Sequence, residues 1–258
     1  MITVFGANTT LEDLQRIPLE RPPKAGAYWE GVPHGALVNT LSDEIRSRGW
    51  NITDQKFSLS KDKGDLVGAF GLEIKGVDAP EGQTLSLGFT TSNMMRMSLK
   101  LLVGTQVTVC LNGMATGEIV MQRKHTHGFN MFQEIESSLD QYIPRAQKIN
   151  HIVKSFQECE ISDKVTDRIL MEAGRSRLMP WSRIGAVDKE YRKPTFAEHG
   201  KGTSWALLNA FTHTVKRNPP LQQMDQMNKF RELLPWVDQE NGNRLGEEGT
   251  HQGQFLLN

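Results

Sequence analysis

The spacing of apolar and polar residues predicts an antiparallel sheet in the first half of the chain. Successive stretches rich in β-branched and aromatic residues alternate apolar with polar positions, and short Asp-, Gly- and Lys-containing turns separate them. Strands joined by such turns pair antiparallel with their sequence neighbours. A meander is therefore predicted near 50–123, with strands at 50–59, 65–75, 84–90, 106–111 and 118–123.

Apolar residues spaced three and four apart predict helices before and after this sheet along the chain. Gly49 is a usual stop for the first helix, and Pro144 is expected to break a longer one. A short buried helix is also predicted inside the sheet, where Ser92 or Asn93 would cap it. The predicted helices cover 34–48, 92–103, 129–156, 162–174, 203–216 and 221–234.

Three segments lack a regular pattern. Prolines interrupt 1–33 and leave one helical turn at 11–14, and a polar connection containing Pro and Gly runs over 175–202. The end of the chain, rich in Gly, Gln and Glu, is expected to be disordered. The predicted fold class is α+β, an antiparallel sheet packed by C-terminal helices. Its parts are a loop-rich segment over 1–33, a single domain over 34–236 and a tail over 237–258.

Composition limits the class of protein. The 258 residues carry a formal net charge of zero, and no apolar run approaches the roughly 18–20 residues that span a bilayer. The first residues lack a charged leader followed by an apolar stretch, and two cysteines are too few for a disulfide framework. We therefore expect a cytoplasmic protein that does not contact a membrane.

Charge is nevertheless distributed unevenly. Residues 121–220 hold 16 basic and 11 acidic residues, whereas 221–258 hold 3 basic and 6 acidic ones. This balance allows a local basic surface for nucleic acid, but not the wide phosphate coverage of a histone-like protein.

The densest polar cluster follows the last predicted strand. Arg123, Lys124, His125 and His127 combine two cations with two imidazoles, a set suited to contacting phosphates. Strand alternation places the two imidazoles on one face, which would also suit a metal ion, but no Glu or Cys stands at a ligand spacing nearby. A solvated strand end is the third interpretation. The nucleic-acid hypothesis adopts the first interpretation, contact with phosphates, and assumes no bound metal.

A second basic segment also contains aromatic residues. Cations that follow phosphates and rings that stack on bases suit a single strand. Asp188 and Glu190 dilute the charge, and an ordinary solvated loop would have the same sequence. The residues expected to contact the strand are Arg175, Arg177, Trp181, Arg183, Tyr191, Arg192 and Lys193.

The helix at 203–216 offers a candidate pocket. Asn209 and His213 share a face one turn apart, with Trp205 one turn earlier, although a buried polar network would use the same residues. Cys110 lies in a predicted strand among apolar residues, where a buried thiol is common. The chain has no phosphate loop, nucleophile elbow, zinc helix or Cys-x-x-Cys pair, so we expect no catalysis and no cofactor.

Two motifs in combination resemble a known family. The first is Val-Cys-x-Asn-Gly-Met at 109–114 followed by Arg-Lys-His-Thr at 123–126, and the second is a helix bearing Trp205, Asn209, Ala210 and Thr212. Together they resemble the phage/plasmid-like family known as domain of unknown function nine-three-two, over about 34–217. At 91–94 the chain has Thr-Ser-Asn-Met where a motif such as Ser-His-Asp is expected. The resemblance implies a bacteriophage or mobile-element origin and supplies no catalytic residues.

The order of the predicted elements is similar to that of phage single-strand annealing proteins, an analogy at the level of fold. The leading hypothesis is an accessory protein that binds single-stranded DNA in replication or recombination, as a homo-oligomer if a free sheet edge pairs between copies. One alternative is a counter-defence protein that binds and inhibits a host immune protein or sequesters its signal. Another is a metal enzyme that uses His125, His127 and His213.

Overall fold

The structure is a computed structural model of the whole chain, and it divides into two compact units, residues 1–149 and 150–258. The single domain expected over 34–236 stays a prediction. At 106–107, 116–117, 236–237 and 244–245 only the backbone is described. The described residues are 7–80, 82–107, 116–126, 128, 130–196, 200–215, 218, 226–227, 229–237 and 244–245.

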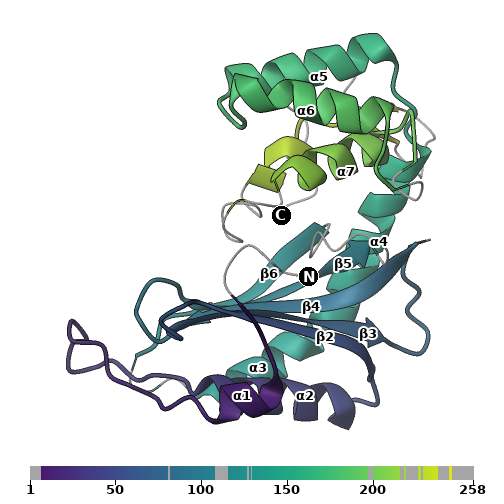
Figure 1. Cartoon of the computed structure of the whole chain (residues 1–258). Helices are drawn as coiled ribbons and strands as arrows, with labels where there is room; N and C mark the ends of the chain where they lie inside the picture. Colours follow the sequence, from purple (N-terminus) through teal and green to yellow (C-terminus); the bar gives the residue numbers. More distant parts are fainter. Residues whose placement is uncertain are drawn as a thin grey trace. The chain divides into compact units, whose positions relative to one another are not determined.

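The first unit contains a six-stranded antiparallel sheet in which every strand pairs with its neighbour in sequence (Figure 1). The predicted meander and the α+β class are therefore confirmed. The first strand was not predicted, because its three residues are too few for an alternating pattern to show. The strands are β1 (Ala7–Thr9), β2 (Asn51–Leu59), β3 (Asp65–Glu73), β4 (Gln83–Ser92), β5 (Leu99–Val107) and β6 (Thr116–Arg123).

One face of this sheet carries the large core side chains. Phe57, Gly68 and Phe89 stand opposite one another on β2, β3 and β4, and Phe70 follows two residues along β3. The three rings are buried, with centroids 5.7, 6.1 and 6.0 Å apart. Because side chains alternate along a strand, the other face receives small residues such as Ala69.

Helices of the first unit cover the aromatic face. Arg123 on β6 pairs with Glu134 of α3 (Met131–Asp140), and Glu118 on β6 pairs with Arg145 of α4 (Tyr142–Glu158). Figure 1 shows α2 (His34–Ser47) on the same side of the sheet as α3.

The predicted helix boundaries in this unit are mostly correct. A capping box between Thr10 and Asp13 begins α1 (Leu11–Gln15), and Gly49 follows α2 with a φ of 72°. The break in the long third helix falls at Gln141, earlier than expected, and Pro144 is the third residue of α4. A proline is tolerated there because the first turn of a helix has free N–H groups in any case.

The short helix predicted at 92–103 is wrong. β4 continues to Ser92, a turn follows, and β5 begins at Leu99. Leu99, Leu101 and Val103 alternate toward the aromatic face, opposite Arg123, Met121 and Glu118 of β6. A dense apolar run fits a buried strand as well as a short helix, and pairing between β4 and β6 decided in favour of the strand.

The second unit is helical, with α5 (Asp163–Arg175), α6 (Trp181–Arg192) and α7 (Ser204–Val215), and a two-stranded ladder of β7 (Trp236–Val237) and β8 (Arg244–Leu245). Ser162 caps α5 and Thr203 caps α7, so both helices begin where the sequence pattern predicted them. Of the last helix predicted at 221–234, the structure describes 226–227 and 229–234, and it shows helix at 226–227 and 229–231. Most of the tail predicted at 237–258 lies outside the described residues. No helix in the described ranges is long and apolar enough to cross a membrane.

The polar connection predicted over 175–202 is wrong in its centre, which is the helix α6. Its apolar residues are few, but Ile184, Val187 and Tyr191 are spaced three and four apart, and the last two are buried. Packing against α5 and α7 stabilises the helix (Figure 1), which its own sequence pattern only weakly indicates.

Candidate nucleic-acid interface

The predicted aromatic contact, Trp181, is the first residue of α6 and lies at a sharp corner between two helices. The chain leaves α5 through bonds from the Arg177 and Leu178 amides to the Gly174 and Ala173 carbonyls. Arg177 has a φ of 55°, and Pro180 occupies the N-cap of α6. This αL residue reverses the chain, so the start of α6 returns over the end of α5.

The ring of Trp181 lies against the backbone of α5. A Cβ added at Gly174 would lie 2.6 Å from the indole, so only glycine allows this contact. Trp181 nevertheless stays 54% exposed. The indole is therefore held in place by the protein while much of it faces solvent, which is the arrangement that a base-stacking residue needs.

Two unpaired cations accompany this ring. Arg175 and Arg177 are exposed, and within the described parts of the chain neither guanidinium has an ion-pair or hydrogen-bond partner. Their charges are free to meet phosphates. We call Arg175, Arg177 and Trp181 the α5–α6 corner.

Two other predicted residues, Arg192 and Tyr191, have surroundings that make them unavailable to a nucleic acid. The Arg192 guanidinium contacts Asp188, Asp163 and Asp167 at 2.8, 2.9 and 3.2 Å, so three carboxylates already offset its charge. Tyr191 is 5% exposed, and burial raises the pKa of its phenol. Because its ring lies inside the helical packing, it is unsuited to stacking on a base.

The remaining basic residues of the segment differ from each other. Arg183 is half-buried and donates to the Asn218 side chain over 3.0 Å, which ties it to the helical unit. Lys193 is exposed at the end of α6, with no ion pair to any described residue. It could add to a phosphate-contacting surface, whereas Arg183 has a structural partner.

In the first unit, the predicted cluster at the end of β6 also contains both exposed and buried residues. Arg123 is paired with Glu134 over 3.0 Å, and Lys124 is exposed. His127 lies outside the described residues. His125 is buried, 7% exposed, with its Nε2 at 3.0 Å from the Thr91 hydroxyl.

The environment of His125 makes it unsuited to phosphate contact. Burial, and then the nearby His34, lower the pKa of His125 to about 4, and burial likewise lowers the pKa of His34. The Nδ1 atoms of both imidazoles are buried and lack a hydrogen-bond partner in the described structure. His125 is therefore a neutral interior residue at pH 7, and among the described residues of this cluster Arg123 and Lys124 are the ones that face solvent as cations.

The candidate pocket on α7 is packed interior over much of its length. Trp205 and Asn209 are 5% and 1% exposed, and the Asn209 amide donates to the Trp205 carbonyl over 3.0 Å. His213 is half-buried beside Phe196, with its Nδ1 at 3.8 Å from Glu190. These contacts correspond to the alternative expected for the helix, a polar network that fixes its orientation. Among the residues that the structure describes, no three His, Cys, Asp or Glu side chains are grouped to hold a metal.

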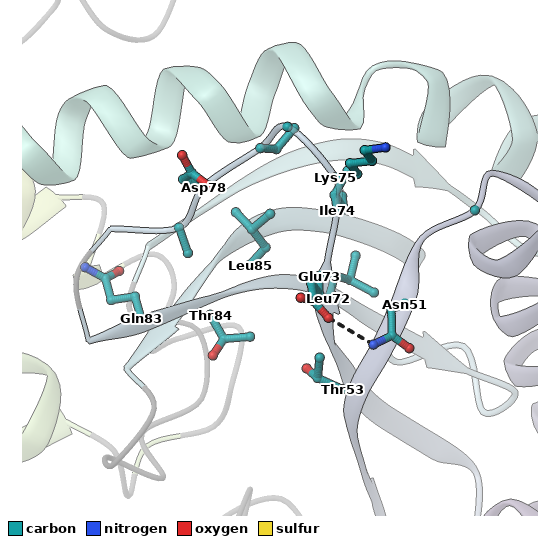
Figure 2. Close-up of a pocket in the computed structure, with 14 residues that line it drawn as sticks. Asn51, Thr53, Leu72, Glu73, Ile74, Lys75, Asp78, Gln83, Thr84 and Leu85 are labelled. Carbon is teal, nitrogen blue, oxygen red and sulfur yellow. Dashed lines mark hydrogen bonds between the residues drawn. The ribbon is translucent and has the colours of Figure 1, made fainter.

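A shallow hollow of about 640 Å³ opens where β2 begins and β3 passes into β4, and none of the predicted site residues lines it (Figure 2). Leu72 and Leu85 belong to its lining, and Asn51 donates to Glu73 over 3.1 Å. Glu73 and Asp78 outnumber the single cation Lys75 in this lining, so the hollow is unfavourable for a phosphate.

These features define an α+β protein with an open antiparallel meander and a basic, aromatic corner on its helices. The chain belongs to the family described as "Domain of unknown function (DUF932)", whose sequence model matches residues 81–234. The family indicated by the two sequence motifs is thus confirmed, and the match includes both the α5–α6 corner and His125. No curated protein and no solved structure matches the chain.

Proposed function

We propose that this protein binds single-stranded DNA through the α5–α6 corner, without catalysing a reaction. The observation that supports this proposal is the half-exposed Trp181, seated on Gly174 and accompanied by the unpaired Arg175 and Arg177. A base has two π-faces and can stack on an indole whatever its identity, and each such stack contributes about 1–3 kcal/mol. Duplex DNA keeps its bases stacked inside, so the corner would favour a single strand.

The small number of free cations sets the expected strength of binding. Each phosphate neutralised on a single strand contributes a slope of about −0.7 to the dependence of log K on log salt. Two arginines therefore account for a slope of about −1.4, with further contributions if Lys193 or Lys124 also contact the backbone. This is modest salt dependence, and it fits a chain with no net charge.

The wider role in this proposal follows the resemblance to phage and plasmid proteins. A single-strand binder of this size would act in replication or recombination, in the cytoplasm of the host cell. The edges of the sheet are β6 and the short β1, and an edge strand can pair with a second copy. Light scattering on the purified protein gives its mass and tests for a homo-oligomer.

Fluorescence anisotropy with a labelled oligothymidine and a labelled duplex, at two salt concentrations, tests the proposal. Trp181→Ala is expected to weaken oligothymidine binding by about tenfold, from the loss of one stacked base. Arg175→Ala with Arg177→Ala is expected to reduce the salt slope by about 1.4.

Two matched controls lie in the same protein. Arg192→Ala removes a cation from the same segment, but one already bound by three carboxylates, so the salt slope should stay unchanged. Phe132→Ala removes a 62% exposed ring from α3 and should leave the affinity unchanged. Equal losses in the controls and in the corner variants, or no binding by the natural protein, would contradict the proposal and favour a protein partner instead.

A further inference from the structure

Two neighbouring turns at one end of the sheet present methionines to solvent. Residues 60–64 connect β2 to β3, and 93–98 connect β4 to β5. Met94 and Met95 are 36% and 53% exposed. The side chain of Met94 crosses the first turn, since a Cβ added at Gly64 would lie 2.0 Å from its Cγ. The two turns therefore form one surface.

Buried polar groups hold the second turn rigidly. The Asn93 side chain accepts from the Val32 amide over 3.0 Å and donates to the Val32 carbonyl over 2.9 Å. The Ser92 hydroxyl accepts from the amides of Met94 and Arg96 at 3.1 and 3.0 Å. The exposed methionines thus stand on an anchored base, and their exposure does not come from a loosely attached loop.

The same turns contain two non-glycine residues in the left-handed region. Met95 has a φ of 62° and Lys63 a φ of 59°. A side chain with a Cβ is disfavoured there, which is why such turns usually carry Gly or Asn. Strained residues that the surrounding structure enforces are concentrated at binding sites. Here the strain places a large apolar side chain in solvent, where it makes little contribution to folding.

The charge around the methionines is positive. The Arg96 guanidinium is bound by Asp62 and by Asp65, the latter at 2.6 Å, so these three groups together carry one negative charge, and Lys61 and Lys63 bring the two turns to a net charge of +1. Lys61 and Lys63 are exposed, and no described acidic residue pairs with them. The surface therefore presents two adjacent thioether side chains and two free ammonium groups, which we call the Met–Lys surface.

We propose that the Met–Lys surface binds a segment of another protein that carries acidic residues together with large apolar side chains. Methionine is flexible and polarizable, so it adapts to apolar side chains of different shapes and is common on peptide-binding surfaces. The lysines complement carboxylates and set the orientation of the segment. A thioether lacks the planar face on which bases stack, so the same surface is poorly suited to a single strand.

Methionine-methyl NMR on the full chain tests this inference, with a short synthetic peptide of glutamate, aspartate and leucine as the probe. The Met94 and Met95 signals should shift on titration, and the signal of Met171, a 43% exposed methionine on α5, should not. A peptide with lysine in place of its acidic residues is the matched control and should cause no shift. Shifts at Met171 of the same size, or equal shifts with the lysine peptide, would overturn the proposal.

Met95→Gly separates binding from folding. Glycine adopts the left-handed region without strain, so the Tm of this variant should rise or stay unchanged while peptide affinity falls by about tenfold. Lys61→Ala should weaken binding and reduce its salt dependence. Unchanged affinity in Met95→Gly refutes the inference, and so does a response of Met94 and Met95 to oligothymidine in place of the acidic peptide.

Discussion

Replacing Gly68 with valine is expected to lower the free energy of unfolding by about 3 kcal/mol, since the added atoms overpack a closed core. A Cβ at this position would lie 2.3 Å from the Phe89 ring and 2.8 Å from the Phe57 ring. Both rings are buried against Phe70, so neither can move without displacing its neighbours. Urea denaturation followed by tryptophan fluorescence measures the change.

Gly26→Ala is the control for this substitution. A Cβ at Gly26 meets no atom within 4 Å, so the change in unfolding free energy should stay within about 0.5 kcal/mol. A Gly68→Val variant as stable as Gly26→Ala would mean that the aromatic cluster does not pack across β3 as the structure has it.

Acidification from pH 6.5 to pH 4 is expected to remove about 2–3 kcal/mol of stability through His125 alone. Burial and then His34 lower the pKa of His125 to about 4 in the folded protein, whereas an unfolded histidine titrates near 6.5. Above pH 6.5 the imidazole is neutral in both states and contributes no pH dependence. Between these values only the unfolded chain binds the proton, so stability falls as pH falls, and the loss ends below about pH 4.

His34, whose pKa is also lowered by burial, should add to this loss in the same direction. His125→Gln keeps a polar side chain within reach of the Thr91 hydroxyl, and it should flatten the stability profile over this range. His151→Gln, which removes an exposed histidine from α4, is the matched control. The parameter to compare is the urea midpoint at pH 7, 5.5 and 4, and parallel profiles for His125→Gln and the natural protein would show that His125 does not cause the loss.

Local sequence signals predicted most of the strands and several helix ends. The alternation over 50–90 and the capping residues Ser162 and Thr203 act within a few residues of where they stand, so the chain itself specifies them. The helix α6 and the first part of β5 were missed for a common reason. An apolar run such as 99–103 fits both a strand and a helix, and a sparse apolar pattern such as 181–192 fits both a helix and a loop. Pairing and packing with neighbouring elements decide between these structures.

For the candidate site, the sequence identified which residue types could contact a nucleic acid but not their surroundings. Trp181 and Tyr191 are both aromatic residues in a basic segment, yet one is half-exposed on Gly174 and the other is buried. Arg177 and Arg192 are equally cationic, yet three carboxylates from α5 and α6 surround only the second. Burial and charge compensation depend on residues that are distant along the chain, so no local pattern shows them.

The sequence by itself therefore determined the family, the α+β class and the antiparallel order of the strands, because these depend on motifs, periodicity and short connections. Only the tertiary structure decided which charges and rings are available to a partner. It buried His125 and Tyr191, offset Arg192 and Arg96, and left Trp181, Met94 and Met95 in solvent. Whether a charge or a ring is available to a partner depends on the folded surface, because it is set by the side chains that the fold brings within a few ångströms.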